Sequence, residues 1–284
     1  MSGTKAKAIY EQSLDSVEDF HTAPQILAQA SIRIQDPNVE VDDIVDLLKA
    51  DPALTADIIR ISNSAFYSFE TEASNLTDAM NRIGFGEIIR LIGISITKSL
   101  FADDLKHYNL SQEDYWANSI CTALMMESFA MSIRMNPNDA YTVGLLHGVG
   151  KIVLDDILTK HRIKDTWNGI KDLTEWEKKV VGFTSAYAGA MILKRWGFPE
   201  KTCHPILYQL HPPKDKIKWA LHTALYLSVY IVSKCEVGFK TTDVDLTEII
   251  PILERMDIDP TKIPSMLSQN REAFVKIKQS FQAA

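Results

Sequence analysis

The fold of this chain is decided by one stretch, Leu145-Leu146-His147-Gly148-Val149-Gly150-Lys151. Two leucines mark the end of an apolar helix, a histidine follows at once, and two glycines then allow helices to pack closely. The imidazole of His147 is a potential metal ligand. The residue that follows it, Gly148, supplies neither charge nor donor atom, so a hard divalent cation that needs oxygen ligands finds none there. The stretch has the form of a metal site that lacks a ligand.

The composition is that of an ordinary globular protein. The chain has 284 residues, of which 46% are apolar, enough for a substantial core in one large domain or two small ones. A formal net charge of −7, without a cluster of lysine and arginine, argues against direct nucleic-acid binding. Residues 1–7 lack a following apolar segment of signal-peptide length, and no stretch reaches 18 uncharged apolar residues. We therefore expect a cytoplasmic protein with no membrane contact.

Every long apolar period in the sequence is close to 3.6 residues, which predicts helices throughout. A helix over 41–48 is followed by Asp51-Pro52, where the aspartate can cap a new helix and the proline can occupy its first turn. Apolar residues on most sides of 88–96 place that helix in the interior. No run alternates for long enough to predict a strand. The sequence thus predicts an all-α protein.

Glycines mark the expected ends of several helices. Gly84-Phe85-Gly86 predicts a break before the helix of 88–96, and Trp196-Gly197-Phe198-Pro199 predicts a buried helix end from which the next helix starts. Near the C-terminus, apolar periods predict helices over 246–256 and from Ile263 onward. The last helix carries an apolar stripe, which we expect to dock on its own chain or on a second copy, because exposure to water would drive association.

An ordered set of short motifs resembles the HD-related output domain (HDOD) family. The set comprises Asp51-Pro52-Ala53-Leu54, Asn63-Ser64-Ala65, Ala79 with Ile83-Gly84, Tyr115-Trp116-Ala117-Asn118-Ser119, Gly144-Leu145-Leu146-His147, Gly182 with Gly189-Ala190, Leu193 with Trp196-Gly197-Phe198-Pro199, and His211-Pro212. The resemblance covers about residues 20–235 and implies an HD-like helical bundle with an N-terminal helical subdomain. Residues 1–19 are then a polar extension, and residues 236–284 are extra C-terminal helices.

The resemblance also implies where an HD phosphohydrolase would hold its metal. Asn118 stands at the position of an early histidine, His147-Gly148 at the His-Asp pair, and Ser185 at an additional histidine. Val229 stands near the distant aspartate, and a histidine pair before a proline has become Leu210-His211. Only His147 and His211 remain as donors, without a carboxylate, so we expect no catalytic metal and no other cofactor. The vestigial pocket is predicted to consist of Asn118, His147, Gly148, Ser185, His211 and Val229.

Because several metal ligands are missing, we expect this protein to bind a partner and not to catalyse a reaction. The resemblance implies an output or regulatory module in bacterial signalling, and we expect a signalling protein or a small regulatory ligand as its partner. The apolar stripe of the last helix also allows a homo-oligomer. One alternative is a metal-dependent phosphohydrolase acting on a nucleotide or cyclic nucleotide, for which Asp155-Asp156 would have to reach the pocket of His147. A second alternative is a scaffold without any ligand, against which an intact polar pocket near Asn118, His147 and Ser185 would argue.

The remaining histidines, glycines and cysteines favour structural roles. We expect His147 to donate to a backbone carbonyl or to Asn118, and we expect His204, His211 and His222 to be packing residues. His21, His107 and His161 lie in polar surroundings and are predicted at the surface. Gly144, Gly148 and Gly150 are predicted to serve close helix packing, since the lysine and strand of a phosphate loop are not in place. Cys121, Cys203 and Cys235 are widely spaced and suit the core, and Cys203 and His204 would point about 100° apart on a helix.

Overall fold

The computed structural model describes residues 23–64, 67, 72–169, 172–210 and 220–282. The polar extension 1–19, His21 and His211 therefore lie outside the described residues. Within them there is no strand, only one isolated bridge between Leu105 and Leu110. The prediction of an all-α protein is confirmed.

The helices follow one another along the chain with short connections. The N-terminal group is α2 (Ala23–Arg33), α3 (Val41–Leu48), α4 (Pro52–Ser62), α5 (Leu76–Ile83) and α6 (Phe85–Leu100). The bundle and its C-terminal additions are α7 (Gln112–Ser132), α8 (Pro137–Leu146), α9 (Val149–Lys160), α10 (Leu173–Val180), α11 (Ser185–Arg195), α12 (Glu200–Leu207), α13 (Ala220–Lys234), α14 (Ile250–Arg255) and α15 (Ile263–Gln282). Two short 3-10 turns, η1 (Lys106–Tyr108) and η2 (Pro260–Lys262), precede α7 and α15.

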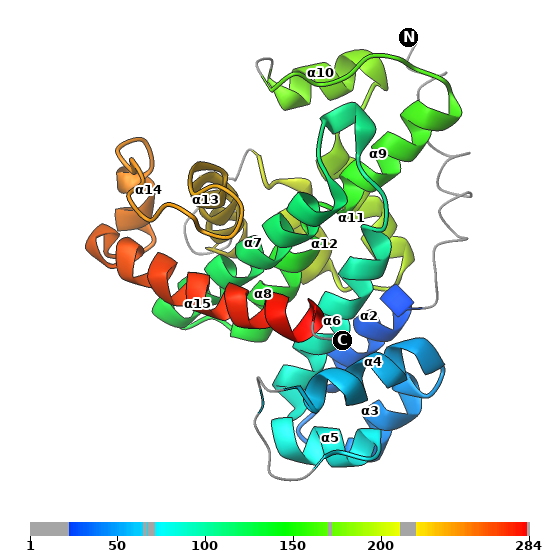
Figure 1. Ribbon diagram of the computed structural model, residues 1–284. Coiled ribbons are helices and arrows are strands. Elements are labelled where there is room, and N and C mark those ends of the chain that lie inside the picture. Colours follow the sequence, from blue (N-terminus) through cyan, green and yellow to red (C-terminus); the bar gives the residue numbers. More distant parts are fainter. Residues whose placement is uncertain (1–22, 65–66, 68–71, 170–171, 211–219, 283–284) are drawn as a thin grey trace.

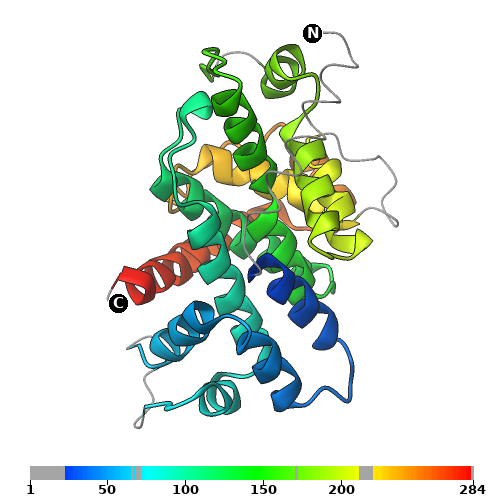
Figure 2. The same ribbon diagram turned by 90° about the vertical axis from the view of Figure 1, so that its right-hand side faces the viewer.

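The helices are arranged along one elongated body. Helices α3, α4 and α5 gather at one end and α10 lies at the other, as Figure 1 shows. The turned view in Figure 2 shows the same separation of the blue and cyan N-terminal helices from the green and yellow part of the bundle. One contiguous apolar core nevertheless includes residues from both groups, so the N-terminal helices pack as part of the same body.

Local capping signals define the N-terminal helices. The backbone N–H of Leu54 donates to Asp51 Oδ1 at 3.0 Å, which satisfies one of the free donors in the first turn of α4. At the other end of α4, the carboxamide of Asn63 donates to the Ala73 carbonyl at 2.9 Å and accepts from its N–H at 2.7 Å. The family motifs at Asp51-Pro52 and Asn63-Ser64 thus begin and end one helix.

Helix α6 joins the N-terminal group to the bundle. Gly84 ends α5 with a φ of 82°, a conformation that favours glycine, and α6 begins at once with Phe85. Gly86 therefore lies inside α6, and the break is shorter than the sequence indicated. Residues 88–89 and 91–97 are buried, as expected of a helix that is apolar on most sides.

The stretch around Trp196 is a helix end of the Schellman type. The N–H of Phe198 donates to the Leu193 carbonyl at 3.0 Å, and the N–H of Gly197 donates to the Lys194 carbonyl at 3.1 Å. Gly197 has a φ of 86°, and Pro199 caps α12 at its N-terminus. Trp196 is buried, so the predicted buried helix end is confirmed.

The C-terminal helices pack on their own chain. The Phe281 ring lies 5.8 Å from the Trp116 ring, Lys278 pairs with Glu113 at 2.6 Å, and Asn270 contacts Ser128 at 3.1 Å. Asn270 in the first half of α15 meets the last turns of α7, whereas Lys278 and Phe281 near its end meet the first turns of α7. The two helices are therefore antiparallel. Helix α14 is shorter than the predicted 246–256 and begins only at Ile250, next to Pro251 in its first turn.

Truncation before Pro260 is expected to cause aggregation or a changed assembly state. Removal of α15 would expose its apolar contacts on α7 to water, where a contiguous apolar surface drives association. Size-exclusion chromatography with light scattering, together with thermal unfolding, would measure this. A monomeric truncation product as stable as the full chain would contradict it.

No described helix is long and apolar enough to cross a membrane.

Candidate functional site

His147 lies at the junction of two helices. It caps the C-terminus of α8, and Gly148 directly precedes α9. Its Nδ1 lies 2.7 Å from the Gly144 carbonyl, and its own carbonyl accepts from Gln209 Nε2 at 3.0 Å. Because a carbonyl oxygen only accepts, Nδ1 carries the proton and Nε2 has the free lone pair. The predicted bond to a backbone carbonyl is confirmed, with Gly144 as the acceptor.

The imidazole of His147 is neutral at physiological pH. Burial lowers its pKa to about 4, and the nearby Lys151 amine also lowers it. A neutral ring whose Nδ1–H is held by a carbonyl is the form in which histidine binds a metal through Nε2. The site therefore keeps one well-oriented donor, and the surrounding residues decide whether a cation could bind.

Tyr115 fills the space beside Gly148. Its hydroxyl donates to the Gly148 carbonyl, and a Cβ built on Gly148 would lie 2.5 Å from the Tyr115 hydroxyl oxygen. The Tyr115 ring is buried and lies 4.6 Å from the Phe101 ring, so it has little room to move aside. The position at which the resemblance places a carboxylate ligand thus lacks the ligand and is also blocked by another side chain.

A buried carboxylate at the other side of the junction comes from α10. Glu177 is fully buried, and its two carboxylate oxygens accept from the Tyr108 hydroxyl at 2.9 Å and from the Ser185 N–H at 2.8 Å. Burial raises the pKa of Glu177, whereas the hydrogen bonds from Ser185 and Tyr108 lower it. Ser185 begins α11, so Glu177 serves the free N–H groups of that helix. Both oxygens already have partners within the protein.

Lys151 lies beside this carboxylate. Its amine lies 5.9 Å from the ring centres of both Tyr108 and Tyr115, within reach of a cation–π contact. Burial lowers the pKa of Lys151, and the Glu177 carboxylate opposes that shift. A positive group next to His147 further disfavours a bound metal cation.

The remaining predicted pocket residues do not complete a ligand set. Asn118 is partly buried on α7, one turn after Tyr115, and Val229 is partly buried on α13. Within the part of the chain that the structure describes, no group of three or more histidine, cysteine, aspartate or glutamate side chains could hold a metal ion. The described residues, which do not include His211, therefore do not fit the two-metal or one-metal centre of an HD phosphohydrolase.

The carboxylates on which the hydrolase alternative depends point elsewhere. Asp155 Oδ1 accepts from the His107 N–H at 2.8 Å and lies 3.0 Å from His107 Nδ1. Asp156 pairs with Lys160 at 2.7 Å on the same helix. The prediction of a surface position for His107 is wrong, because Asp155 and the Ile163 carbonyl, 2.9 Å from Nε2, hold its ring in the interior. His161 is exposed, as predicted.

The structure also brings together two histidines that the sequence treated separately. His204 Nδ1 of α12 lies 2.6 Å from His222 Nε2 of α13, and the Tyr208 ring lies 4.7 Å from the His204 ring. Burial and, to a lesser extent, the neighbouring His204 together lower the pKa of His222 to about 4. The pair acts as a contact between the two helices, in keeping with the predicted packing role.

The predicted packing role of the glycines is confirmed. A Cβ on Gly150 would lie 1.8 Å from the Ser185 carbonyl oxygen, where α9 crosses α11. A Cβ on Gly144 would lie 2.7 Å from the Ala123 Cα of α7. The three cysteines are buried and free, which confirms their core position.

Sequence reasoning missed Tyr115 and Glu177 as members of the site. Tyr115 precedes Asn118 by three residues, a spacing that puts both on one face of a helix. Glu177 follows Leu173 by four residues, so it lies on the same face as that leucine and Val180. The helical spacing in the sequence could have placed each of these residues on the correct face of its helix. The spacing does not show which residues of other helices lie opposite that face.

Gly148→Asp is expected to destabilise the protein by about 1–3 kcal/mol, because the new side chain collides with Tyr115 in a packed interior. The same change should cost less in a Tyr115→Ala background, where the space is open. A double-mutant cycle by urea denaturation measures this coupling. An equal loss of unfolding free energy in both backgrounds would show that Tyr115 does not block the space beside Gly148.

Solved structures with this fold come from several bacteria. A "putative phosphohydrolase" from Shewanella amazonensis is 21% identical, with a TM-score of 0.68, over 95% of this chain and 98% of that one. An HDOD domain protein of unknown function from Geobacter sulfurreducens is 22% identical, with a TM-score of 0.67, over 94% and 96%. A "putative signal transduction protein" from Marinobacter aquaeolei is 20% identical, with a TM-score of 0.68, over 98% and 65%. At these identities the likeness establishes the fold.

Among curated proteins, an uncharacterized protein of Treponema pallidum is 24% identical over 205 residues. The match covers 70% of this chain but only 39% of that relative's length. The family model for the HDOD domain matches residues 21–212, which include the junction at His147, Tyr115 and Glu177. Since that match covers more than half of the sequence, the chain belongs to the HDOD domain family.

Proposed function

We propose that this chain is a non-catalytic regulatory output module, which acts by binding a signalling protein or a small regulatory ligand. The observation that carries the proposal is the Tyr115 hydroxyl, which lies where a carboxylate beside His147 would begin. A bound cation must have several protein donors before its water becomes a useful nucleophile. His147 offers one such donor, and the nearby Glu177 oxygens are engaged by Tyr108 and Ser185.

Similarity to proteins described in signalling terms agrees with this proposal. The Marinobacter aquaeolei structure carries a signal-transduction description and shares the fold over 98% of this chain. His147 Nδ1 and both Glu177 oxygens have hydrogen-bond partners within the protein, which suits a rigid core that supports a binding surface. A homo-oligomer stays a prediction.

A metal-dependent phosphohydrolase acting on a nucleotide or cyclic nucleotide is the second candidate. One observation favours it: His147 is neutral, buried and held through Nδ1, which leaves Nε2 as a ligand. The positions of Asp155 and Asp156 weigh against it, because His107 and Lys160 engage them.

The protein is expected to hydrolyse no phosphodiester or phosphomonoester above background with magnesium, manganese or iron. The test incubates metal-reconstituted protein, purified without an affinity tag, with cyclic dinucleotides, nucleoside triphosphates and a chromogenic phosphodiester. Gly148→Asp should be equally inactive, because Asn118, Ser185 and Val229 still stand where the resemblance places other metal ligands. Turnover that survives repurification and disappears in His147→Ala would overturn the proposal and favour the hydrolase.

A further inference from the structure

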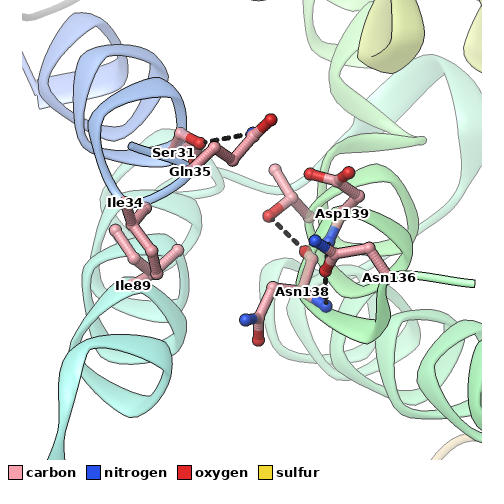
Figure 3. A pocket seen from close by; sticks show the side chains of 8 residues that line it. Ser31, Ile34, Gln35, Ile89, Asn136, Asn138 and Asp139 are labelled. Carbon is pink, nitrogen blue, oxygen red and sulfur yellow. Dashed lines mark hydrogen bonds between the residues drawn. The ribbon is translucent and has the colours of Figure 1, made fainter. Parts of the chain in front are cut away.

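A polar pocket lies between the N-terminal helices and the bundle, apart from the junction at His147. It has a volume of about 350 Å³ and opens where α2 and α6 face the first turn of α8 (Figure 3). That volume lies within the range of roughly 300–1,000 Å³ of small-molecule sites. Its lining residues all differ from those of the vestigial pocket.

One wall of this pocket is apolar. Ile34, directly after α2, and Ile89 of α6 lie side by side and face α8 across the pocket, as Figure 3 shows. Ile89 is almost fully buried, and Ile34 is partly exposed. The exposed parts of these two aliphatic side chains offer a narrow apolar contact for one face of a flat ring.

The opposite wall is polar and is formed by the start of α8. Asn136 Oδ1 accepts from the N–H groups of Asn138 and Asp139 at 2.9 and 3.3 Å, which fixes the amide and leaves its Nδ2 as a donor. Thr142 Oγ1 donates to the Asn138 carbonyl at 2.9 Å and can still accept. The Asn138 carboxamide lies against Gly86, where a Cβ would be 3.5 Å away. The wall therefore presents both donors and acceptors.

The pocket has no unpaired charge. Asp139 is the one carboxylate among the lining residues, and Lys201 lies 2.7 Å from both its Oδ2 and Gln35 Oε1. Lys201 thereby joins α12, α8 and the segment after α2. The Ser31 hydroxyl, by contrast, is buried without a hydrogen-bond partner among the described residues. A buried polar group of this kind calls for a partner, and none of the described residues supplies one.

We propose that this pocket binds a neutral, flat heteroaromatic ligand whose edge carries both donors and acceptors, as the base of a purine nucleoside does. The ring packs on Ile34 and Ile89, and the Asn138 carboxamide pairs with the edge, since asparagine matches adjacent donor and acceptor atoms of adenine. A phosphate is disfavoured, because the nearby cation, Lys201, is already shared between Asp139 and Gln35.

The inference rests on the proposed regulatory function and names the class of its ligand. A molecule in this pocket contacts α2 and α6 on one side and α8 on the other. Its binding therefore stabilises the arrangement of the N-terminal helices on the bundle, in proportion to its occupancy.

The test is isothermal titration of the full chain with adenosine and guanosine, with ribose and adenosine monophosphate for comparison. Saturable binding of a nucleoside is expected, with no binding of ribose and no gain in affinity from the phosphate. Asn138→Ala should weaken nucleoside binding about tenfold through loss of the paired carboxamide. The matched control is Asn81→Ala on α5, an exposed asparagine outside the pocket, which should bind as the wild type does.

Ser31→Ala gives a second variant that should fold normally, because it removes a buried hydroxyl without a partner. It is expected to weaken nucleoside binding several-fold. The proposal is overturned by no saturable nucleoside binding, by equal binding of ribose, by tighter binding of the monophosphate, or by unchanged affinity in both pocket variants. If no nucleoside binds in the titration, the proposed ligand class is wrong, but the proposed non-catalytic function is unaffected. If phosphate is released in the hydrolysis assay, the proposed non-catalytic function is wrong.

Discussion

Gly150→Ala is expected to lower the free energy of unfolding by about 3 kcal/mol, at the upper end for overpacked interiors. The new Cβ would lie 1.8 Å from the Ser185 carbonyl oxygen and 2.5 Å from the Gly189 nitrogen. Both are backbone atoms, so α9 and α11 would have to separate along their length. In an isolated helix the same change would instead stabilise by about 1 kcal/mol, because alanine has the higher helix propensity.

The matched control for Gly150 is Gly86→Ala. Gly86 is also helical, yet a Cβ there would meet only the Asn138 side chain at an ordinary 3.5 Å. Urea denaturation with linear extrapolation compares the two variants, and the Gly86 variant should be neutral or slightly more stable. Equal midpoints for the two variants would show that α9 and α11 do not cross as closely as described.

Trp196→Ala is expected to cost about 3–5 kcal/mol, since removal of a buried indole leaves a cavity that the surroundings fill only in part. Trp196 is 6% exposed and lies at the end of α11, where Gly197 and Phe198 bond back to the helix. Loss of the ring removes the packing that holds this helix end against the core. Thermal and urea unfolding would both register the change.

Lys194→Ala provides the control on the same helix. Its side chain is 64% exposed and pairs with Glu200 at the surface, so the free energy of unfolding should be close to that of the wild type. A Trp196→Ala variant that melts with the wild type would mean that the indole is not part of the core.

Features that depend on a few neighbouring residues could be predicted from the sequence. Asp51 caps α4 and Gly197 ends α11 because a cap bond or a positive φ is decided within one helical turn. The bounds of α3 follow from a strong 3.6-residue period in the same way. The predicted helix over 246–256 was too long because Pro251 favours the first turn of a helix, and α14 begins only there.

The sequence by itself determined that position 148 offers no ligand, and it limited the expected partner of the His147 ring to a backbone carbonyl or Asn118, of which the Gly144 carbonyl is the one found. Only the tertiary structure decided what occupies the space, because Tyr115 lies 33 positions away from Gly148 and reaches it through the packing of α7 on α8. The burial of His107 on Asp155, 48 positions away, has the same origin. Helix crossings set such contacts, and a local pattern of residues carries no record of which helix lies opposite.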